Sequence, residues 1–307
     1  MRVLMSGASG LIGTALTKAL IDRGDEVVAL VRTSSPSGTA NQIHWDPSKQ
    51  QLNGGDLEQH GPYDAVVHLA GAGIGDKRWT PARKAEILES RVDGTALLAT
   101  RCSELSVLPS VFLSGSAIGF YGDTGNEVAT EASPQGAGFL ADVCRQWEGA
   151  ASPIEQSGVR TVFLRTGIVL DPNGGALAKQ LPLFRFGLGG KLGSGKQWFS
   201  WISIRDEVSA ILAVIDHDEF SGPVNLTAPN PVTNAEFTKA LGTVLRRPTV
   251  AAVPGFALKI ALGSELADEA LLASTRILPE QLTRHNFSFA DETVLEALSD
   301  LLDTSRR

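Results

Sequence analysis

Gly7-Ala8-Ser9-Gly10-Leu11-Ile12-Gly13 is the stretch that decides the fold of this chain. It follows the apolar run Val3-Leu4-Met5, with Ser6 between them, and opens a helical pattern that ends at Gly24. That pattern rests on apolar residues at helical spacing, namely Leu11, Ile12, Ala15, Leu16, Ala19 and Leu20. Residues 27–31 then have the composition of a second buried strand. A strand, a glycine turn and a helix in this order predict a site for a dinucleotide pyrophosphate.

Each glycine of this loop has its own expected role. Gly7 makes the tight turn, Gly10 lets the backbone approach the phosphates, and Gly13 lets the helix lie close to the sheet. The N-terminus of the helix adds unpaired N–H groups and a partial positive charge. The expected cofactor-binding residues of the loop are Gly7, Ser9, Gly10, Leu11, Ile12 and Gly13. The alternative is an ordinary strand–helix turn that is rich in glycine.

Composition excludes several classes of protein. The net charge of −7 over 307 residues, with no basic stripe, argues against nucleic-acid binding. The longest apolar runs are far too short to span a membrane. The N-terminus enters a strand at once instead of a signal peptide, so we expect a cytoplasmic protein. Cys102 and Cys144 are expected to be buried thiols, and the scattered histidines predict no metal site.

Strands and helices alternate through the first half of the chain. Residues 64–71, 111–114 and 159–164 are predicted strands, and residues 82–98 and 138–151 are predicted helices. This alternation predicts an α/β fold, a Rossmann-like doubly wound parallel sheet with helices on both faces. The residues that follow its strands are Gly7, Arg32, Ala70, Ser114 and Thr166. All five are therefore expected to face one crevice, where such sheets bind their ligands.

The second half has a looser pattern. We expect a nucleotide-binding core over residues 1–170 and a smaller, largely helical substrate part over 171–307. The chain is expected to return to the core near 201–227 and to end in a helical tail at about 250–302. Glycine-dense residues 174–195 read as loops that form a lid or substrate wall. Arg185, Lys191 and Lys196 there either meet an anionic substrate or are ordinary surface charges.

The end of the second strand indicates which cofactor binds. An acidic residue there would hold the ribose 2′-hydroxyl and repel a 2′-phosphate. The sequence instead has Arg32, whose planar charged fork suits a phosphate, followed by Thr33, Ser34 and Ser35. We therefore predict NADP(H) as the cofactor, unless Arg32 is merely a solvated surface arginine.

Several motifs together resemble the extended short-chain dehydrogenase/reductases. They are the glycine loop, Leu69-Ala70-Gly71, Arg91-Val92-Asp93-Gly94-Thr95 and Ser114-Gly115-Ser116. Residues 165–170, 184–190, 193–198 and the tail around 253–258 and 277–280 are similar to a narrower branch. That branch is the NAD-dependent epimerase/dehydratase-like, sugar-nucleotide epimerase-like family with a C-terminal domain of unknown function. The resemblance covers essentially the whole chain.

The resemblance implies further cofactor contacts. Leu69, Ala70 and Gly71 would line the adenine and ribose side, and the backbone of Ile168 would meet the nicotinamide end. Glu86 and Arg91 match positions used around the cofactor, although a solvated helix face explains them equally well.

The usual catalytic pair of this wider family is missing. A tyrosine exchanges a proton with the substrate, and a lysine four residues later favours its ionised form. Here Val67 follows Tyr63 at that spacing, and Gly125 follows Tyr121. The expected place, residues 139–144, carries neither a phenol nor an ammonium group.

Two functional hypotheses follow from this absence. In the first, an NADP(H)-dependent oxidoreductase or epimerase-like enzyme acts on a small carbonyl, hydroxy or sugar-nucleotide substrate through a relocated proton donor. Tyr121 is the preferred proton donor, although it could equally pack over the cofactor. Ser116, which best matches the family's Ser/Thr position, and Ser114 are the other catalytic candidates, with water or Asp142 as a possible shuttle. In the second, the protein is a non-catalytic NADPH-binding sensor or scaffold. The sequence carries no indication of oligomeric state.

Overall fold

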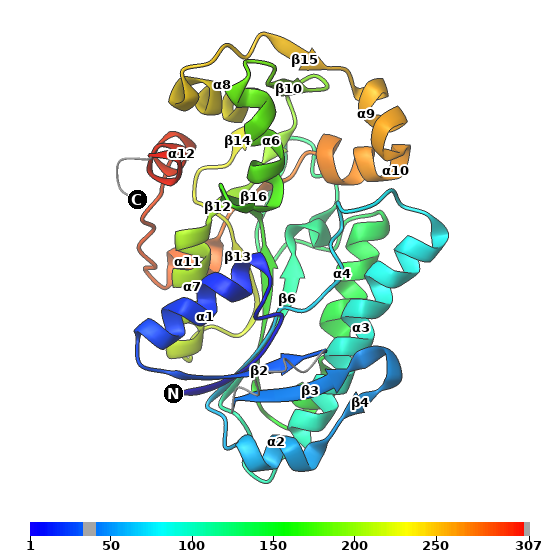
Figure 1. Cartoon of the computed structure of the whole chain (residues 1–307), viewed down its shortest axis with the longest axis vertical. Helices are drawn as coiled ribbons and strands as arrows, with labels where there is room; N and C mark the ends of the chain where they lie inside the picture. Colours follow the sequence, from blue (N-terminus) through cyan, green and yellow to red (C-terminus); the bar gives the residue numbers. More distant parts are fainter. Residues whose placement is uncertain (33–40, 304–307) are drawn as a thin grey trace.

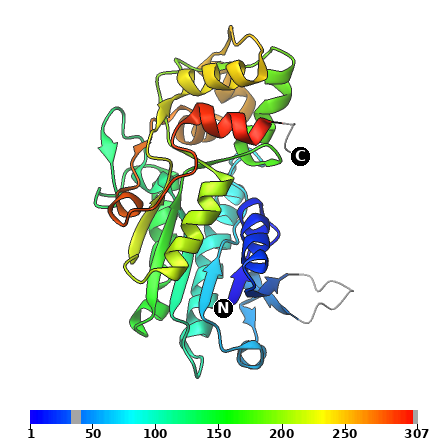
Figure 2. The same cartoon turned by 90° about the vertical axis from the view of Figure 1, so that its left-hand side faces the viewer.

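A computed structural model describes residues 1–32 and 41–303. Its centre is an eight-stranded sheet, seen between helices in two views (Figure 1, Figure 2). The strand order is β13 (Gly222–Leu226), β8 (Arg160–Thr166), β6 (Val111–Ala117), β5 (Ala65–His68), β1 (Arg2–Ser6), β2 (Glu26–Val31), β3 (Gln42–Asp46) and β4 (Gln51–Leu52). All neighbours are parallel except β3 and β4. The predicted doubly wound α/β fold is confirmed.

Helices cover both faces of this sheet. α1 (Leu11–Asp22) and α7 (Ile204–Asp216) pack on one face, where Val3 and Met5 are buried. α3 (Pro81–Ser103) and α5 (Ser152–Gln156) pack on the other, against Leu4. α4 (Phe139–Gly149) lies beside α3, and α2 (Gly54–His60) lies below the same layer (Figure 1). Adjacent residues of β1 serve opposite cores because side chains alternate along a strand.

The sheet order brings the predicted strand ends together. β2, β1, β5, β6 and β8 are consecutive, parallel neighbours, so their carboxyl ends lie along one edge. Ser116, near the end of β6, pairs in register with Arg165 of β8. The predicted crevice therefore has its residues on five adjacent strand ends. β13 then completes the main sheet beyond β8.

A second group of elements lies beyond that edge. β9 (Ile168–Asp171) pairs with β12 (Trp201–Ser203), β10 (Gly190–Leu192) with β15 (Ala251–Val253), and β11 (Trp198–Phe199) with β14 (Val232–Thr233). α6 (Gly175–Arg185), α8 (Asn234–Leu245) and α12 (Val294–Leu302) surround a third apolar core that contains Trp201. Thr233 caps α8 and forms a capping box with Glu236.

Residues 175–185 differ from the loop expected there. They form α6, whose Leu177, Leu181 and Phe184 are buried at helical spacing. The glycines before it and Pro182 within it obscured this pattern, because both residue types usually mark loops.

The tail combines helices with short strands. α9 (Gly255–Leu262), α10 (Ser264–Ala267) and a π-helical turn (Asp268–Leu272) follow β15. β16 (Arg276–Ile277), which pairs with β7 (Val128–Ala129), and α11 (Glu280–Arg284) then lead to α12. Within the described ranges, no helix is long and apolar enough to cross a membrane.

Candidate functional site

The glycine loop between β1 and α1 is tightly built at both ends. Gly7 has a φ of 74°, and a Cβ added to it would lie 2.7 Å from the carbonyl carbon of Leu69. A Cβ added to Gly13 would lie 2.1 Å from the carbonyl oxygen of Gly7. A Cβ on Gly10 would approach only that same oxygen, at 3.3 Å. Because Gly7 and Gly13 have no side chain, the turn can pack directly against Leu69 and against its own backbone. Gly10 is exposed to solvent.

The start of α1 suits an anion. Gly10 is its N-cap, no side chain caps it, and its first turn has no acidic residue. The N–H groups of Leu11, Ile12 and Gly13 have no carbonyl within the helix to bind. Ser9 is exposed beside them. The loop and helix end therefore fit a diphosphate that approaches at Gly10.

Arg32 directly follows β2 at the same edge. It is exposed, and its carbonyl oxygen accepts a hydrogen bond from His44 Nε2 at 3.0 Å. Thr33, Ser34 and Ser35 lie outside the described residues.

Leu69, Ala70 and Gly71 follow β5 and lie between the loop and α3. Leu69 adjoins Gly7, while Gly71 packs against the Arg91 guanidinium, 3.3 Å from the position of an added Cβ. Arg91 is 8 % exposed and donates to the carbonyl oxygen of Ala72 at 2.9 Å. Burial lowers the pKa of Arg91 to about 10. This arginine is therefore buried against Gly71 and does not lie on a solvated helix face.

The Glu86 side chain is exposed to solvent, whereas the Arg91 side chain on the same helix is buried. It is exposed and forms an ion pair with Arg83 at 2.6 Å. The Arg83 guanidinium lowers the pKa of the Glu86 carboxyl. The two predicted positions on α3 are therefore not brought together by the fold.

The three proposed proton donors have different surroundings. Ser114 is fully buried, and its hydroxyl contacts the carbonyl oxygen of Gly115 at 3.3 Å. Ser116 is 5 % exposed and donates to Glu148 Oε1 at 2.7 Å. The Tyr121 hydroxyl donates to Asn225 Oδ1 at 2.7 Å and accepts from Arg165 at 2.9 Å. Burial raises the pKa of Tyr121.

Glu148 and Arg165 connect these groups. The Arg165 fork binds both carboxylate oxygens of Glu148, at 2.8 and 2.9 Å, and its guanidinium lies 3.5 Å from the centre of the Phe120 ring. Sequence reasoning missed this pair. Its signal was an arginine within an otherwise apolar strand, since a buried arginine needs a partner. We call Ser116, Glu148, Arg165, Tyr121 and Asn225 the edge network.

Residues 139–144, where the resemblance led us to expect the tyrosine and lysine, form the first half of α4. Leu140 and Cys144, four residues apart on α4, both adjoin Gly119 beyond the end of β6. The Cys144 thiol contacts the carbonyl oxygen of Ala117 at 3.6 Å, and burial raises the pKa of Cys144 to about 11. Cys102 and Cys144 are free and buried, as predicted. The α4 side chains next to Gly119 are therefore the alkyl group of Leu140 and the protonated thiol of Cys144.

Two buried titratable groups flank the sheet edge. Glu207 accepts from Thr166 Oγ1 at 2.9 Å, and its Oε2 has no partner among the described residues. Burial raises the pKa of Glu207 to about 8. His68 Nδ1 is 2.6 Å from Ser6 Oγ, and burial lowers the pKa of His68 to about 4. Both are neutral near pH 7.

Ile168 is the first residue of β9, and its backbone N–H donates a hydrogen bond to the carbonyl oxygen of Ser200 at 2.9 Å.

No group of three His, Cys, Asp or Glu side chains that could hold a metal ion occurs in residues 1–32 and 41–303.

Known proteins resemble this chain over its full length. The profile of the NAD dependent epimerase/dehydratase family matches residues 3–226, and that of a domain of unknown function matches residues 253–301. An epimerase family protein of Mycobacterium leprae, ML0860, is 42% identical over 297 residues, spanning 97% of this chain and 94% of the relative.

Solved structures agree with these matches. Human epimerase family protein SDR39U1, crystallised with NADPH, superposes with a TM-score of 0.90 at 31% identity, covering 99% of this chain and 100% of the human chain. A nucleoside-diphosphate sugar epimerase from Corynebacterium glutamicum has a TM-score of 0.78 at 36% identity, and the match covers 100% of this chain and 60% of that one. With its glycine loop, parallel sheet and sequence relatives in agreement, this chain belongs to the NAD dependent epimerase/dehydratase family.

Proposed function

We propose that this protein is an NADP(H)-dependent oxidoreductase or epimerase-like enzyme that acts on a small carbonyl, hydroxy or sugar-nucleotide substrate. The observation that carries the proposal is the uncapped start of α1 behind an open Gly10, with Arg32 at the next strand end. The NADPH bound to the human relative supports the choice of cofactor, and the Corynebacterium epimerase supports the substrate class.

The cofactor would lie along the carboxyl edge of the sheet. Residues 7–13 would hold its pyrophosphate, and Arg32 its 2′-phosphate. Leu69, Ala70 and Gly71 would line the adenosine half of the cofactor, and the Arg91 guanidinium packs against Gly71. The backbone of Ile168 would meet the nicotinamide end. NADP(H), when bound, supplies or accepts a hydride.

Ser116 is our preferred contact for the reacting oxygen of the substrate. Its hydroxyl points at Glu148, which leaves lone pairs on Oγ for a substrate hydroxyl. As that substrate proton moves to Ser116 Oγ, the proton of Ser116 can pass to Glu148 Oε1 at 2.7 Å. The hydroxyl of Tyr121 is already engaged on both sides, so Tyr121 is better suited to holding Arg165 in place.

Cofactor choice is tested by titrating NADPH and NADH against the wild type and Arg32→Ala. We expect the variant to lose at least about tenfold of its NADPH affinity, because one phosphate contact to an arginine disappears, while NADH binding stays the same. Arg101→Ala removes a half-buried arginine at the far end of α3 that pairs with Glu104 and serves as the control. An unchanged NADPH preference in Arg32→Ala would refute the assignment.

One observation favours the second candidate function, a sensor or scaffold that binds NADPH without turnover. Leu140 and Cys144, which adjoin Gly119, lie in the segment where the resemblance implies the acid–base pair, and neither can serve as that pair. NADPH oxidation over a panel of aldehydes, ketones and nucleotide sugars separates the two. Turnover that disappears in Ser116→Ala supports the enzyme, whereas tight NADPH binding without turnover on the whole panel supports the sensor.

A further inference from the structure

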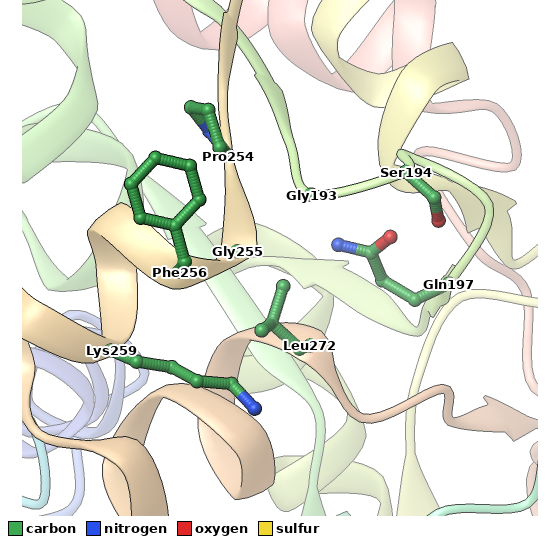
Figure 3. A pocket seen from close by; sticks show the side chains of 8 residues that line it. All are labelled: Gly193, Ser194, Gln197, Pro254, Gly255, Phe256, Lys259 and Leu272. Atoms are coloured by element: carbon green, nitrogen blue, oxygen red, sulfur yellow. The ribbon is translucent and has the colours of Figure 1, made fainter.

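Residues 255–272, formed by α9, α10 and the π-helical turn, make one helical segment between β15 and β16, and we call them the flap (Figure 1). A hollow lies on each side of it. One separates Pro254 and Phe256 from Ser194 and Gln197, as Figure 3 shows. The other lies between the flap and residues 78–80. Gly263, with a φ of 95°, joins its two helices.

The flap has a buried side and an exposed side. Leu266 and Ala267 are buried, whereas Phe256 is 68% exposed and Ile260 is 72% exposed. Its polar attachments to the sheet-bearing part are few. The carbonyl oxygen of Ile260 accepts from Arg78 Nη2 at 3.1 Å, and Glu265 forms an ion pair with Lys84.

Glu269 makes the contact that reaches the candidate site. Its carboxylate accepts the backbone N–H groups of Phe139 at 3.0 Å and Leu140 at 2.8 Å, so it caps α4 across more than a hundred residues of sequence. Gly138 makes room for it: a Cβ there would lie 3.1 Å from the Glu269 carboxyl carbon. A negative charge at the start of a helix is stabilising, so the flap and α4 hold each other.

The first turn of α4 lies next to the expected reacting end. Leu140 contacts the position of Gly119, and Cys144 one turn later adjoins the end of β6, which carries Ser116. Ser116 is 5 % exposed and Cys144 is 4 % exposed. Neither hollow beside the flap is lined by Ser114 or Ser116. A substrate that is to touch Ser116 therefore needs a local opening.

We propose that the flap is a lid over the reacting end of the crevice and that Glu269 is its latch on α4. This proposal rests on the proposed function in one respect, the use of Ser116 as the substrate contact. Besides the Glu269 carboxylate, the flap is held by two contacts of charged groups, by the Gln197 Nε2 hydrogen bond to the carbonyl oxygen of Leu271 and by the buried side chains of Leu266 and Ala267. The contacts of its charged groups are the part that is weak enough to break and re-form during a catalytic cycle. The proposed latch would assign a role to part of residues 253–301, the segment that matches a domain of unknown function.

The two cysteines provide an internal readout of opening. Cys144 lies at the reacting end, whereas Cys102 lies in the core between the sheet and α3. Burial raises the pKa of Cys144 to about 11 and that of Cys102 to about 12, so both thiols react slowly while covered. Peptide-resolved maleimide labelling of the full chain measures their rates separately.

We expect Glu269→Gln to label Cys144 about fivefold faster, the change expected for loss of a helix cap, with the Cys102 rate unchanged. Glu104→Gln removes one exposed carboxylate of an ion pair remote from the flap, and it should leave both rates unchanged. Equal acceleration of both cysteines in Glu269→Gln would indicate global destabilisation and overturn the proposal, as would no acceleration at all.

The wild type tests the latch without a substitution. Raising NaCl from about 0.05 to about 0.5 M shortens the Debye length severalfold, so it should speed labelling of Cys144 and not of Cys102. A salt-independent Cys144 rate contradicts an electrostatic latch, even if the variant does not fold. NADPH titration of the same samples tests the proposed function independently: failure to bind NADPH refutes that function, whereas the labelling rates judge the flap alone.

Discussion

Gly10 and Gly13 are three residues apart, yet a methyl group would meet different surroundings at each. Gly13→Ala would place a Cβ 2.1 Å from the carbonyl oxygen of Gly7, which is backbone and cannot turn aside. We expect this variant to lose about 1–3 kcal/mol of unfolding free energy or more. Gly10→Ala puts a Cβ in a tight contact of 3.3 Å with that same oxygen, much less severe than at Gly13, and fills the approach to the phosphates. We expect it to fold with at most a small loss of stability and to bind NADPH at least about tenfold more weakly.

Thermal unfolding and NADPH titration of both variants check this pair of outcomes. Gly24→Ala is not a suitable control, because Gly24 has a φ of 89°. Gly149 has open space around an added Cβ and an ordinary helical position, so Gly149→Ala is the matched control. Normal NADPH affinity in Gly10→Ala would remove the phosphate site from this loop.

Glu207 predicts a dependence of stability on pH. In the unfolded chain its carboxyl ionises above its ordinary pKa of 4.5, but burial holds the folded-state pKa at about 8. Its contribution to stability is therefore fully present below pH 4.5 and is lost as the pH rises towards 8. Relative to Glu207→Gln, the wild type should lose on the order of 3 kcal/mol between about pH 5 and pH 8.

Urea unfolding of both proteins at several pH values measures this difference. Glu104→Gln removes an exposed carboxyl and should follow the wild type. Parallel curves for the wild type and Glu207→Gln would mean that Glu207 ionises normally in the folded protein.

At the level of elements, one buried ion pair joins β8 to α4. The side chains of Arg165 and Glu148 are 5% and 11% exposed, so removing one partner leaves a charge with little water around it. We expect Arg165→Met or Glu148→Leu alone to cost about 3–5 kcal/mol of unfolding free energy. Arg165→Met combined with Glu148→Leu removes both charges and should cost clearly less than the sum of the two single changes. A double-mutant cycle by urea unfolding measures the coupling, and additive losses would contradict it.

The sequence predicted some elements well and others poorly, for local reasons. α1 was predicted because apolar residues recur at helical spacing from Leu11 to Leu20 directly after the glycine loop. α6 was missed because Pro182 and the preceding glycines resemble loop residues, although Leu177, Leu181 and Phe184 keep the helical spacing. Short pairs such as β16 with β7 have two residues each and form only because distant segments meet.

On the scale of the whole molecule, Glu131 joins the main sheet to the tail. Its carboxylate accepts the N–H groups of Asn225 in β13 at 3.0 Å and of Glu280 and Gln281 at the start of α11, both at 3.1 Å. Burial raises the pKa of Glu131, and the three hydrogen bonds oppose that rise. Loss of this carboxylate leaves up to three N–H groups without an acceptor.

We expect Glu131→Ala to lower the unfolding free energy by roughly 3 kcal/mol and Glu131→Gln, which keeps one acceptor oxygen, by less. Urea unfolding measures both. Glu127→Ala, in the same segment and exposed, should change stability by less than about 0.5 kcal/mol. A cost for Glu131→Ala as small as that of this control would show that the tail is held by other contacts.

The sequence by itself determined the nucleotide-binding character of this protein. The glycine loop, the alternation of strands and helices, the arginine at position 32 and the missing tyrosine–lysine pair are all readable from neighbouring residues, because turn geometry, periodicity and strand-end position are local properties. Only the tertiary structure decided which side chains share the crevice. It turned Arg91 inward and Glu86 outward, engaged Tyr121 with Arg165, and placed Glu269 on the start of α4. These contacts depend on the directions of side chains and on packing between segments far apart in the chain, which local sequence patterns do not encode.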